Sequence, residues 1–273
     1  MSVFTTPEPI TATLTTAGAR VRLVASERAD TVVRVEPIDA ASKSDVKVAE
    51  KTKVGFTGGE LSIETKKAGG KEGSVSITIE LPAGSRLALN TAWSDVRGEG
   101  LFGECVLEVG SGRIQVDRVA AVRGNLAAGE VEIGHVAGTV DIEGGSAGVR
   151  IGEAAGTIRY VGSSGKVWIG HALSDVDLSG ASGSFDIDRA DGAVAAKAAN
   201  CPIRVGRLSR GQAELVNASG GIAVGIDGDT ASVDAKSTKG SVRSAFTTDG
   251  GESGVKIYAR TRLDDIVIHR AAA

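Results

Sequence analysis

A repeat of eighteen residues in the middle of the chain constrains the fold more than any other feature. Within each repeat two pairs of apolar residues lie nine residues apart, and one polar residue separates the members of a pair. This alternation is typical of short β-strands, whose successive side chains face opposite sides. The four apolar columns are Val131, Val149, Val167, Phe185, Ile203, Ile222 and Val242; Ile133, Ile151, Ile169, Ile187, Val205 and Val224; Val140, Ile158, Val176 and Val194; and Ile142, Tyr160, Leu178, Ala196 and Leu215.

Such a repeat predicts a solenoid, because each unit covers the apolar face of the next. Weaker repeats continue upstream through residues 94–98, 103–109 and 111–116. The chain has 38 glycines and only 3% aromatic residues, which fits many tight turns around thin aliphatic layers. The sequence therefore predicts an all-β, single-chain β-solenoid, similar to a parallel β-helix, with two short strands per rung of about 18 residues.

Residues 1–92 contain alternating strands that do not follow this repeat. The segment VGFTGGELSIET predicts a hairpin with Gly58 and Gly59 at its tip, and SVSITIELPAGSRLALN predicts two strands around a Pro-Ala-Gly turn. The charged stretch 41–53 and the loop KKAGGKEG are expected to be exposed. We interpret residues 1–92 as an antiparallel β cap on the solenoid of residues 93–273, in one continuous fold unit. The strand DDIVIH is expected to close the other end.

The composition and the termini restrict the possible binding partners and the expected location in the cell. The net charge is −3 and no block of like charge occurs, which argues against nucleic acid as a partner. The N-terminus lacks a signal-peptide pattern, and no apolar run reaches the length of a membrane segment. Cys105 and Cys201 form no disulfide framework and are expected to pack in the core. The sequence predicts a cytoplasmic protein.

One corner of the predicted rungs carries a column of titratable residues. The column reads His135, Glu153, His171, Arg189 and Arg207. Histidine and carboxylate can bind zinc, but the two histidines would be two rungs, about 10 Å, apart. We interpret the column as an exposed charge ladder and predict no metal site, no cofactor and no catalytic residue. His135, Glu153 and His171 are the one candidate metal group that the pattern offers.

The outward residues also alternate in charge along the predicted stack. One ladder contains Arg150 beside Trp168, which favours a cation–π contact. We interpret these ladders as surface pairs that fix the register of the rungs, each of which contributes little alone. The two ladders are Glu132, Arg150, Trp168, Asp186 and Arg204, and Asp141, Arg159 and Asp177.

Three segments together resemble a known family. They are SITIELPAGSRLALNTAWSDVRGEG, the G-x-I-x-V rungs that follow it, and the closing DDIVIH. The chain resembles, from ITATL to its end, a widespread bacterial β-strand-repeat domain family of unknown function that is named "putative adhesin". The resemblance implies a single-stranded β-solenoid without established catalytic residues, and the family's name implies a surface role.

The pattern favours binding over catalysis. Parallel β-helices that cleave polysaccharides place paired carboxylates in a groove built by long loops, whereas here the turns are short and carboxylates alternate with arginines. We predict a non-catalytic structural or protein-interaction module whose partner is another protein or itself. Two alternatives stay open. One is a self-assembling, cytoskeleton-like filament, and the other is a carbohydrate-binding or carbohydrate-active β-helix enzyme.

Overall fold

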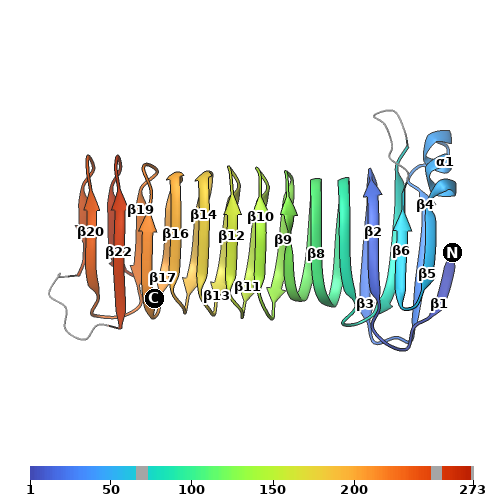
Figure 1. Ribbon diagram of the computed structural model, residues 1–273, viewed down its shortest axis with the longest axis horizontal. Coiled ribbons are helices and arrows are strands. Elements are labelled where there is room, and N and C mark those ends of the chain that lie inside the picture. Colours follow the sequence, from blue (N-terminus) through green and yellow to red (C-terminus); the bar gives the residue numbers. More distant parts are fainter. Residues whose placement is uncertain (66–72, 247–253, 272–273) are drawn as a thin grey trace. The chain divides into compact units, whose positions relative to one another are not determined.

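The computed structural model describes residues 1–65, 73–246 and 254–271, and it confirms an all-β solenoid. The described residues contain one helix, and all other regular elements are strands (Figure 1). The chain divides into two compact units, unit 1 (Met1–Ala137) and unit 2 (Gly138–Ala273). The boundary predicted between residues 92 and 93 lies within strand β8 and stays a prediction.

Unit 2 confirms the register that the repeat predicts. Val149 pairs with Val167, and Val140 pairs with Ile158, in parallel strands eighteen residues apart. The columns are buried, since Val167 and Ile158 are each 2% exposed. The regular strands are β10 (Val140–Gly144), β11 (Gly148–Ala154), β12 (Ile158–Gly162), β13 (Lys166–Ala172), β14 (Val176–Ser182), β15 (Ser184–Ala190), β16 (Val194–Asn200) and β17 (Ile203–Leu208).

Tyr160 shows how the columns tolerate a large residue. It stands where its neighbours along the column are Ile142 and Leu178, and its hydroxyl is buried without a hydrogen-bond partner among the described residues. A Cβ added to Gly162 or Gly165 would lie only 2.2 or 2.3 Å from that oxygen. The tyrosine ring therefore fits because glycine stands at these two corner positions.

Unit 1 contains shorter rungs. The long strand β8 (Arg86–Leu126) pairs in parallel with β9 (Glu130–Val136), and Arg113 stands opposite Glu130, seventeen residues later. The side-chain amide of Asn125 likewise donates a hydrogen bond to Glu108, also seventeen residues away. A spacing of seventeen instead of eighteen explains why the upstream repeats follow the pattern only weakly.

The first residues form both antiparallel strands and parallel rungs. The antiparallel pairs are β1 with β4, β4 with β7, and β5 with β6. However, β2 pairs in parallel with β6 and β8, and β3 pairs in parallel with β7 and β8. The rung made of β2 and β3 thus lies between the β6–β7 rung and β8. The bounds are β1 (Ser2–Thr5), β2 (Thr11–Ala17), β3 (Ala19–Ser26), β4 (Asp30–Pro37), β5 (Lys53–Thr57), β6 (Glu60–Glu64) and β7 (Val75–Pro82).

The charged stretch 41–53 is exposed as predicted, but it contains a helix that the sequence analysis missed. Helix α1 (Lys43–Lys51) begins after Ser42, whose hydroxyl accepts a hydrogen bond from the backbone N–H of Asp45. This spacing of serine and an acidic residue is a capping signal. No residue of the helix is buried. Most of the loop KKAGGKEG, residues 66–72, lies outside the described residues.

The C-terminal rung corrects two expectations. Strands β22 (Val255–Thr261) and β23 (Ile266–Arg270) lie between the rung of β18 (Gly211–Val216) and β19 (Ile222–Ile226) and the rung of β20 (Ser232–Ser237) and β21 (Val242–Ser244). Val242 therefore pairs with Ile266 and not with Ile222. The expectation that DDIVIH closes the end is also wrong, because β20 and β21 lie outside it (Figure 1).

Candidate functional site

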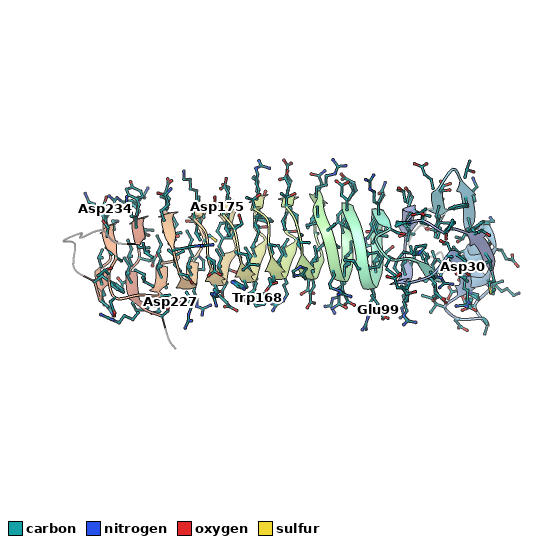
Figure 2. The ribbon with its side chains drawn as sticks, turned by 90° about the horizontal axis from the view of Figure 1, so that it is seen from below. Asp30, Glu99, Trp168, Asp175, Asp227 and Asp234 are labelled. Carbon is teal, nitrogen blue, oxygen red and sulfur yellow. The ribbon has the colours of Figure 1, made fainter. Side chains whose placement is uncertain are left out.

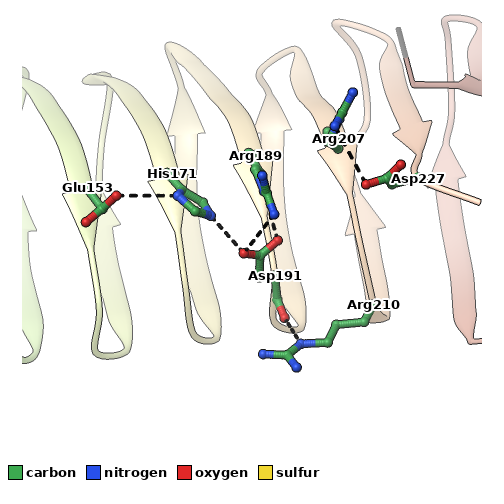
Figure 3. Close-up of polar contacts among 7 residues, drawn as sticks. All are labelled: Glu153, His171, Arg189, Asp191, Arg207, Arg210 and Asp227. Atoms are coloured by element: carbon green, nitrogen blue, oxygen red, sulfur yellow. Dashed lines mark hydrogen bonds and ion pairs between the residues drawn. The ribbon is translucent and has the colours of Figure 1, made fainter. Parts of the chain in front are cut away.

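The predicted corner column is present in unit 2. Glu153 stands in register with His171, His171 with Arg189, and Arg189 with Arg207 (Figure 3). His135 belongs to unit 1, where it stands in register with Arg118. Within unit 2 the structure thus brings together Glu153 and His171 of the candidate group.

His171 lies between two carboxylates. Its Nδ1 is 3.5 Å from an oxygen of Glu153, and its Nε2 is 2.8 Å from an oxygen of Asp191 (Figure 3). Arg189 Nε donates a second hydrogen bond to Asp191, at 3.0 Å. Asp191 thus forms an ion pair with Arg189 and a hydrogen bond with His171, and Glu153 lies on the other side of the histidine ring.

Asp191 is the residue of this cluster that the sequence analysis missed. Its side chain is only 14% exposed. Burial alone would raise the pKa of Asp191, but hydrogen bonds from His171 and Arg189 outweigh it and lower the pKa from 3.8 to about 2. The only sequence signal is the turn dipeptide Asp191-Gly192 after β15. Across the described ranges, no group of three or more histidine, cysteine, aspartate or glutamate side chains is arranged to hold a metal ion.

A groove lies elsewhere in unit 2, on the outer face of β18, β22 and β20. Its volume is about 460 Å³. Two ladders of outward side chains line it, because the parallel register aligns one residue from each strand. The first ladder is Gln212, Lys256 and Ser232, and the second is Glu214, Tyr258 and Asp234.

Tyr258 stands at the centre of this groove. The residue is 42% exposed, and the guanidinium of Arg260 lies 4.0 Å from the centre of its ring. Arg260 is held in turn by Asp234, at 2.7 Å, and this hydrogen bond raises the pKa of Arg260 above its ordinary value. The exposed ring is therefore fixed in place by a cation–π contact and an ion pair.

A second groove of about 420 Å³ adjoins the first, since both are lined by Gln212 and Lys256. It extends toward the corner, where Asp191 and Arg210 line it. Arg210 Nε donates a hydrogen bond to the backbone carbonyl of Asp191 (Figure 3). The charged corner and the Tyr258 groove thus belong to one continuous surface of unit 2.

The carboxylates beside Tyr258 already hold cations. Glu214 lies 2.9 Å from Lys197 Nζ, and Asp234 pairs with Arg260. Both carboxylates beside the ring are therefore engaged with a cation of the same chain, an arrangement that suits binding.

The two cysteines are buried, as predicted. Burial raises the pKa of the Cys105 thiol to about 12 and that of the Cys201 thiol to about 11. The reactive form of cysteine is the thiolate, so neither residue is suited to nucleophilic catalysis.

The opposite outer face of unit 2 confirms the predicted surface pairs. Arg150 lies over the ring of Trp168, 4.5 Å from its centre, and Arg204 pairs with Asp186. On the groove's own face, Arg159 donates to Asp141 at 2.8 Å. Trp168 and Asp234 project to opposite sides of the unit (Figure 2).

No family model and no curated protein sequence matches the chain. Similar solved structures include a "putative adhesin" from Parabacteroides distasonis, 11% identical with a TM-score of 0.42, over 98% of this chain and 95% of that one. A "putative lipid binding protein" from the same species is 13% identical with a TM-score of 0.43, over 99% and 96%. A "putative adhesin" from Parabacteroides merdae is 10% identical with a TM-score of 0.41, over 98% and 94%.

The two adhesin names agree with the resemblance found from the sequence. At these identities and TM-scores the likeness carries no information on ligand or partner. In the part of the chain that the structure describes, no helix has the length and apolar character needed to cross a membrane.

Proposed function

We propose that this chain is a non-catalytic protein-interaction module whose partner binds the outer face of β18, β22 and β20. The observation that carries the proposal is the exposed Tyr258, fixed by Arg260 at the centre of this groove. Tyrosine and arginine dominate the few residues that supply most of the binding energy in protein interfaces.

The surroundings of Tyr258 suit an interface. Gln212, Lys256 and Ser232 form a polar row beside the ring, and such groups supply the hydrogen bonds of an interface rim. Because Arg260 and Asp234 already hold the ring in place, little side-chain freedom is lost on binding.

Self-assembly is a second candidate function, and a separate observation favours it. Strand β20 pairs with β22 and β21 pairs with β23, and among the described residues neither β20 nor β21 has a strand on its other edge. Open strand edges can pair with another chain. Light scattering on a sizing column over a wide concentration range, with electron microscopy, tests this. Polymers that grow with concentration support the filament, and one fixed size at every concentration rejects it.

The test of the main proposal uses Tyr258→Ala and a matched control. Trp168→Ala is that control, because Trp168 is also an outward aromatic residue covered by an arginine, but on the opposite face of unit 2. Each variant and the unaltered protein are immobilised and exposed to proteins from the source cells, and retained proteins are quantified by mass spectrometry. We expect a partner that the control retains and that Tyr258→Ala binds about tenfold or more weakly.

Two results would overturn this assignment. Equal retention by all three proteins would show that Tyr258 does not anchor a partner. Binding of a neutral oligosaccharide that is lost in Tyr258→Ala, without any retained protein, would identify the groove as a carbohydrate site instead.

A further inference from the structure

Four arginines line a groove on the outer face of β3 and β8 in unit 1. The groove has a volume of about 210 Å³ and is lined by Arg20, Arg22, Arg97 and Arg113, with one carboxylate, Asp95, and the neutral polar residues Ser76 and Gln115. Three of the arginine side chains are 57 to 70% exposed. The groove is separate from the Tyr258 surface, since all of its residues belong to unit 1.

The register of this face places like charges together. Arg22 stands directly opposite Arg97 on the neighbouring strand. In unit 2, by contrast, Arg159 stands between Asp141 and Asp177. Like charges directly opposite each other in a sheet are destabilising. On this outer face of β3 and β8, which we call the arginine face, positive charges are therefore not alternated with negative ones as they are in the ladder of unit 2.

The carboxylates near the groove do not neutralise all four arginines. Glu99 accepts hydrogen bonds from Arg22 and lies 3.3 Å from Arg97, so one carboxylate serves two guanidinium groups. Arg113 pairs with Glu130 at 3.0 Å. Arg20 stands in register with Asp95, but within the described parts of the chain it makes no ion pair. The four arginines therefore face three carboxylates, Asp95, Glu99 and Glu130, and one positive charge in the groove is not balanced.

The spacing favours a ligand with several anionic groups. The arginines come from three successive rungs, which span about 10 Å, so one small anion cannot contact all of them. An exposed ion pair contributes little alone, but linked groups bind together much more tightly. A polymer with repeated negative charges can span this distance and contact several of the arginines at once.

The neutral lining indicates the class of polymer. Ser76 offers a hydroxyl, and Gln115 offers its amide oxygen and the second N–H of an amide that already donates to Glu132 at 3.0 Å; these groups can hydrogen-bond the hydroxyls of a sugar chain. None of the described lining residues is aromatic, whereas single-stranded nucleic acid is bound by stacking on aromatic rings and protein partners by aromatic anchors. We propose that this groove binds a polysaccharide that carries sulfate or carboxylate groups.

Titration calorimetry of the full chain with heparin, a sulfated polysaccharide, tests the proposal at low ionic strength. We expect saturable binding that weakens as salt is added. Arg20→Ala should bind about threefold to fivefold more weakly, and Arg20→Ala combined with Arg113→Ala about tenfold. The matched control is Arg86→Ala, which removes an exposed arginine from β8 that stands opposite Thr11 and outside this groove. It should bind as the unaltered protein does, and thermal melting confirms that each variant folds.

Several outcomes would overturn the proposal. If heparin does not bind, or if Arg86→Ala and Arg20→Ala weaken binding equally, no site exists at this groove. If inorganic sulfate binds as tightly as heparin, the ligand is a small anion. If single-stranded DNA of matched charge binds equally well, the surface attracts any polyanion. Tyr258→Ala should leave heparin binding unchanged, so the result is independent of the proposed protein partner.

Discussion

The regular rungs of unit 2 and the rungs near the two chain ends differ in whether the rungs stack in the order in which they occur in the chain. Between β10 and β17 each new rung is added beside the previous one, so chain order and stacking order agree. At the ends they do not agree. The first rung, β2–β3, lies between β6–β7 and β8, and the last rung, β22–β23, lies between β18–β19 and β20–β21.

This placement protects the inserted rungs β2–β3 and β22–β23. A rung at the end of a stack is hydrogen-bonded on one side only, and terminal segments fray unless they are tied down. An inserted rung is bonded on both sides, as β22 is to β18 and β20. In unit 2 the end of the stack is then formed by β20 and β21, which are internal in sequence, whereas in unit 1 the first strand of the chain, β1, lies at the outer edge of β4. The arrangement has a kinetic consequence, because inserted strands must find partners far away in the chain.

Removal of the inserted rung should have the largest effect. Without residues 255–273, β20 and β21 lose their neighbours β22 and β23. We expect the amides of 232–237 and 242–244 to lose their protection in hydrogen exchange, although these residues precede the deletion. The amides of β10 to β15 should stay protected and serve as the internal control. Protection of β20 in the truncated chain would mean that it can stack directly on β18.

A matched pair of isoleucines sharpens the comparison. Ile257 in β22 and Ile187 in β15 are 3% and 1% exposed, and each lies between two parallel neighbours. Substitution of either by alanine should lower the free energy of unfolding by about 2 to 5 kcal/mol. The kinetic effects should differ. The partners of Ile187 are eighteen residues away, whereas Ala213 is 44 residues from Ile257.

Closing a longer loop costs more entropy, so the inserted rung should form late in folding. Stopped-flow measurements in denaturant check this. Ile187→Ala should mainly slow folding, and Ile257→Ala should mainly speed unfolding. Equal slowing of folding in both variants would contradict late insertion.

The same difference explains what the sequence could predict. The columns through Val149 and Val140 were predictable because equal spacing reports stacking wherever the chain adds rungs in order. Val242 and Ile266 were placed wrongly, because insertion of a later rung leaves no regular interval between neighbours. The groove around Tyr258 could not be predicted either, because its central strand, β22, belongs to the inserted rung. The alternation in VKIYART places Tyr258 and Arg260 on one face, but nothing in the sequence shows that Glu214 and Asp234 flank the ring.

Asp191 extends the comparison to the corners of the regular rungs. Its folded-state pKa, about 2, lies below its ordinary value of 3.8. The resulting stabilisation is therefore present above about pH 4 and is lost as the pH falls toward 2. It should amount to about 1 to 2 kcal/mol, because one pKa unit corresponds to about 1.4 kcal/mol and solvent screens part of it.

Asp191→Asn tests this assignment. The variant should lose that stability at neutral pH, and its free energy of unfolding should vary less between pH 4 and pH 2. Asp265→Asn is the control at the inserted rung. Hydrogen bonds from Ser241 lower the pKa of Asp265, but its side chain is 45% exposed, so a much smaller change is expected. Chemical denaturation at several pH values measures both, and parallel pH curves for Asp191→Asn and the unaltered protein would argue against the network.

The smallest expected effect compares the outer ladders of the two units. Arg159→Gln removes a cation that lies between Asp141 and Asp177, and it should lower the free energy of unfolding only slightly. Arg97→Gln removes a cation that stands opposite Arg22, and it leaves Glu99 to Arg22 alone. It should therefore raise the free energy of unfolding by a similar amount.

Added salt distinguishes these surface effects from packing effects. Both changes come from exposed charges, so both should shrink as ionic strength rises. Heparin should reverse the sign at Arg97, because a bound polyanion stabilises the unaltered arginine face more than the variant. If Arg97→Gln destabilises unit 1 without any ligand, Glu99 already neutralises the repulsion between Arg22 and Arg97. The pairing of these two arginines would then be no evidence for an anionic ligand.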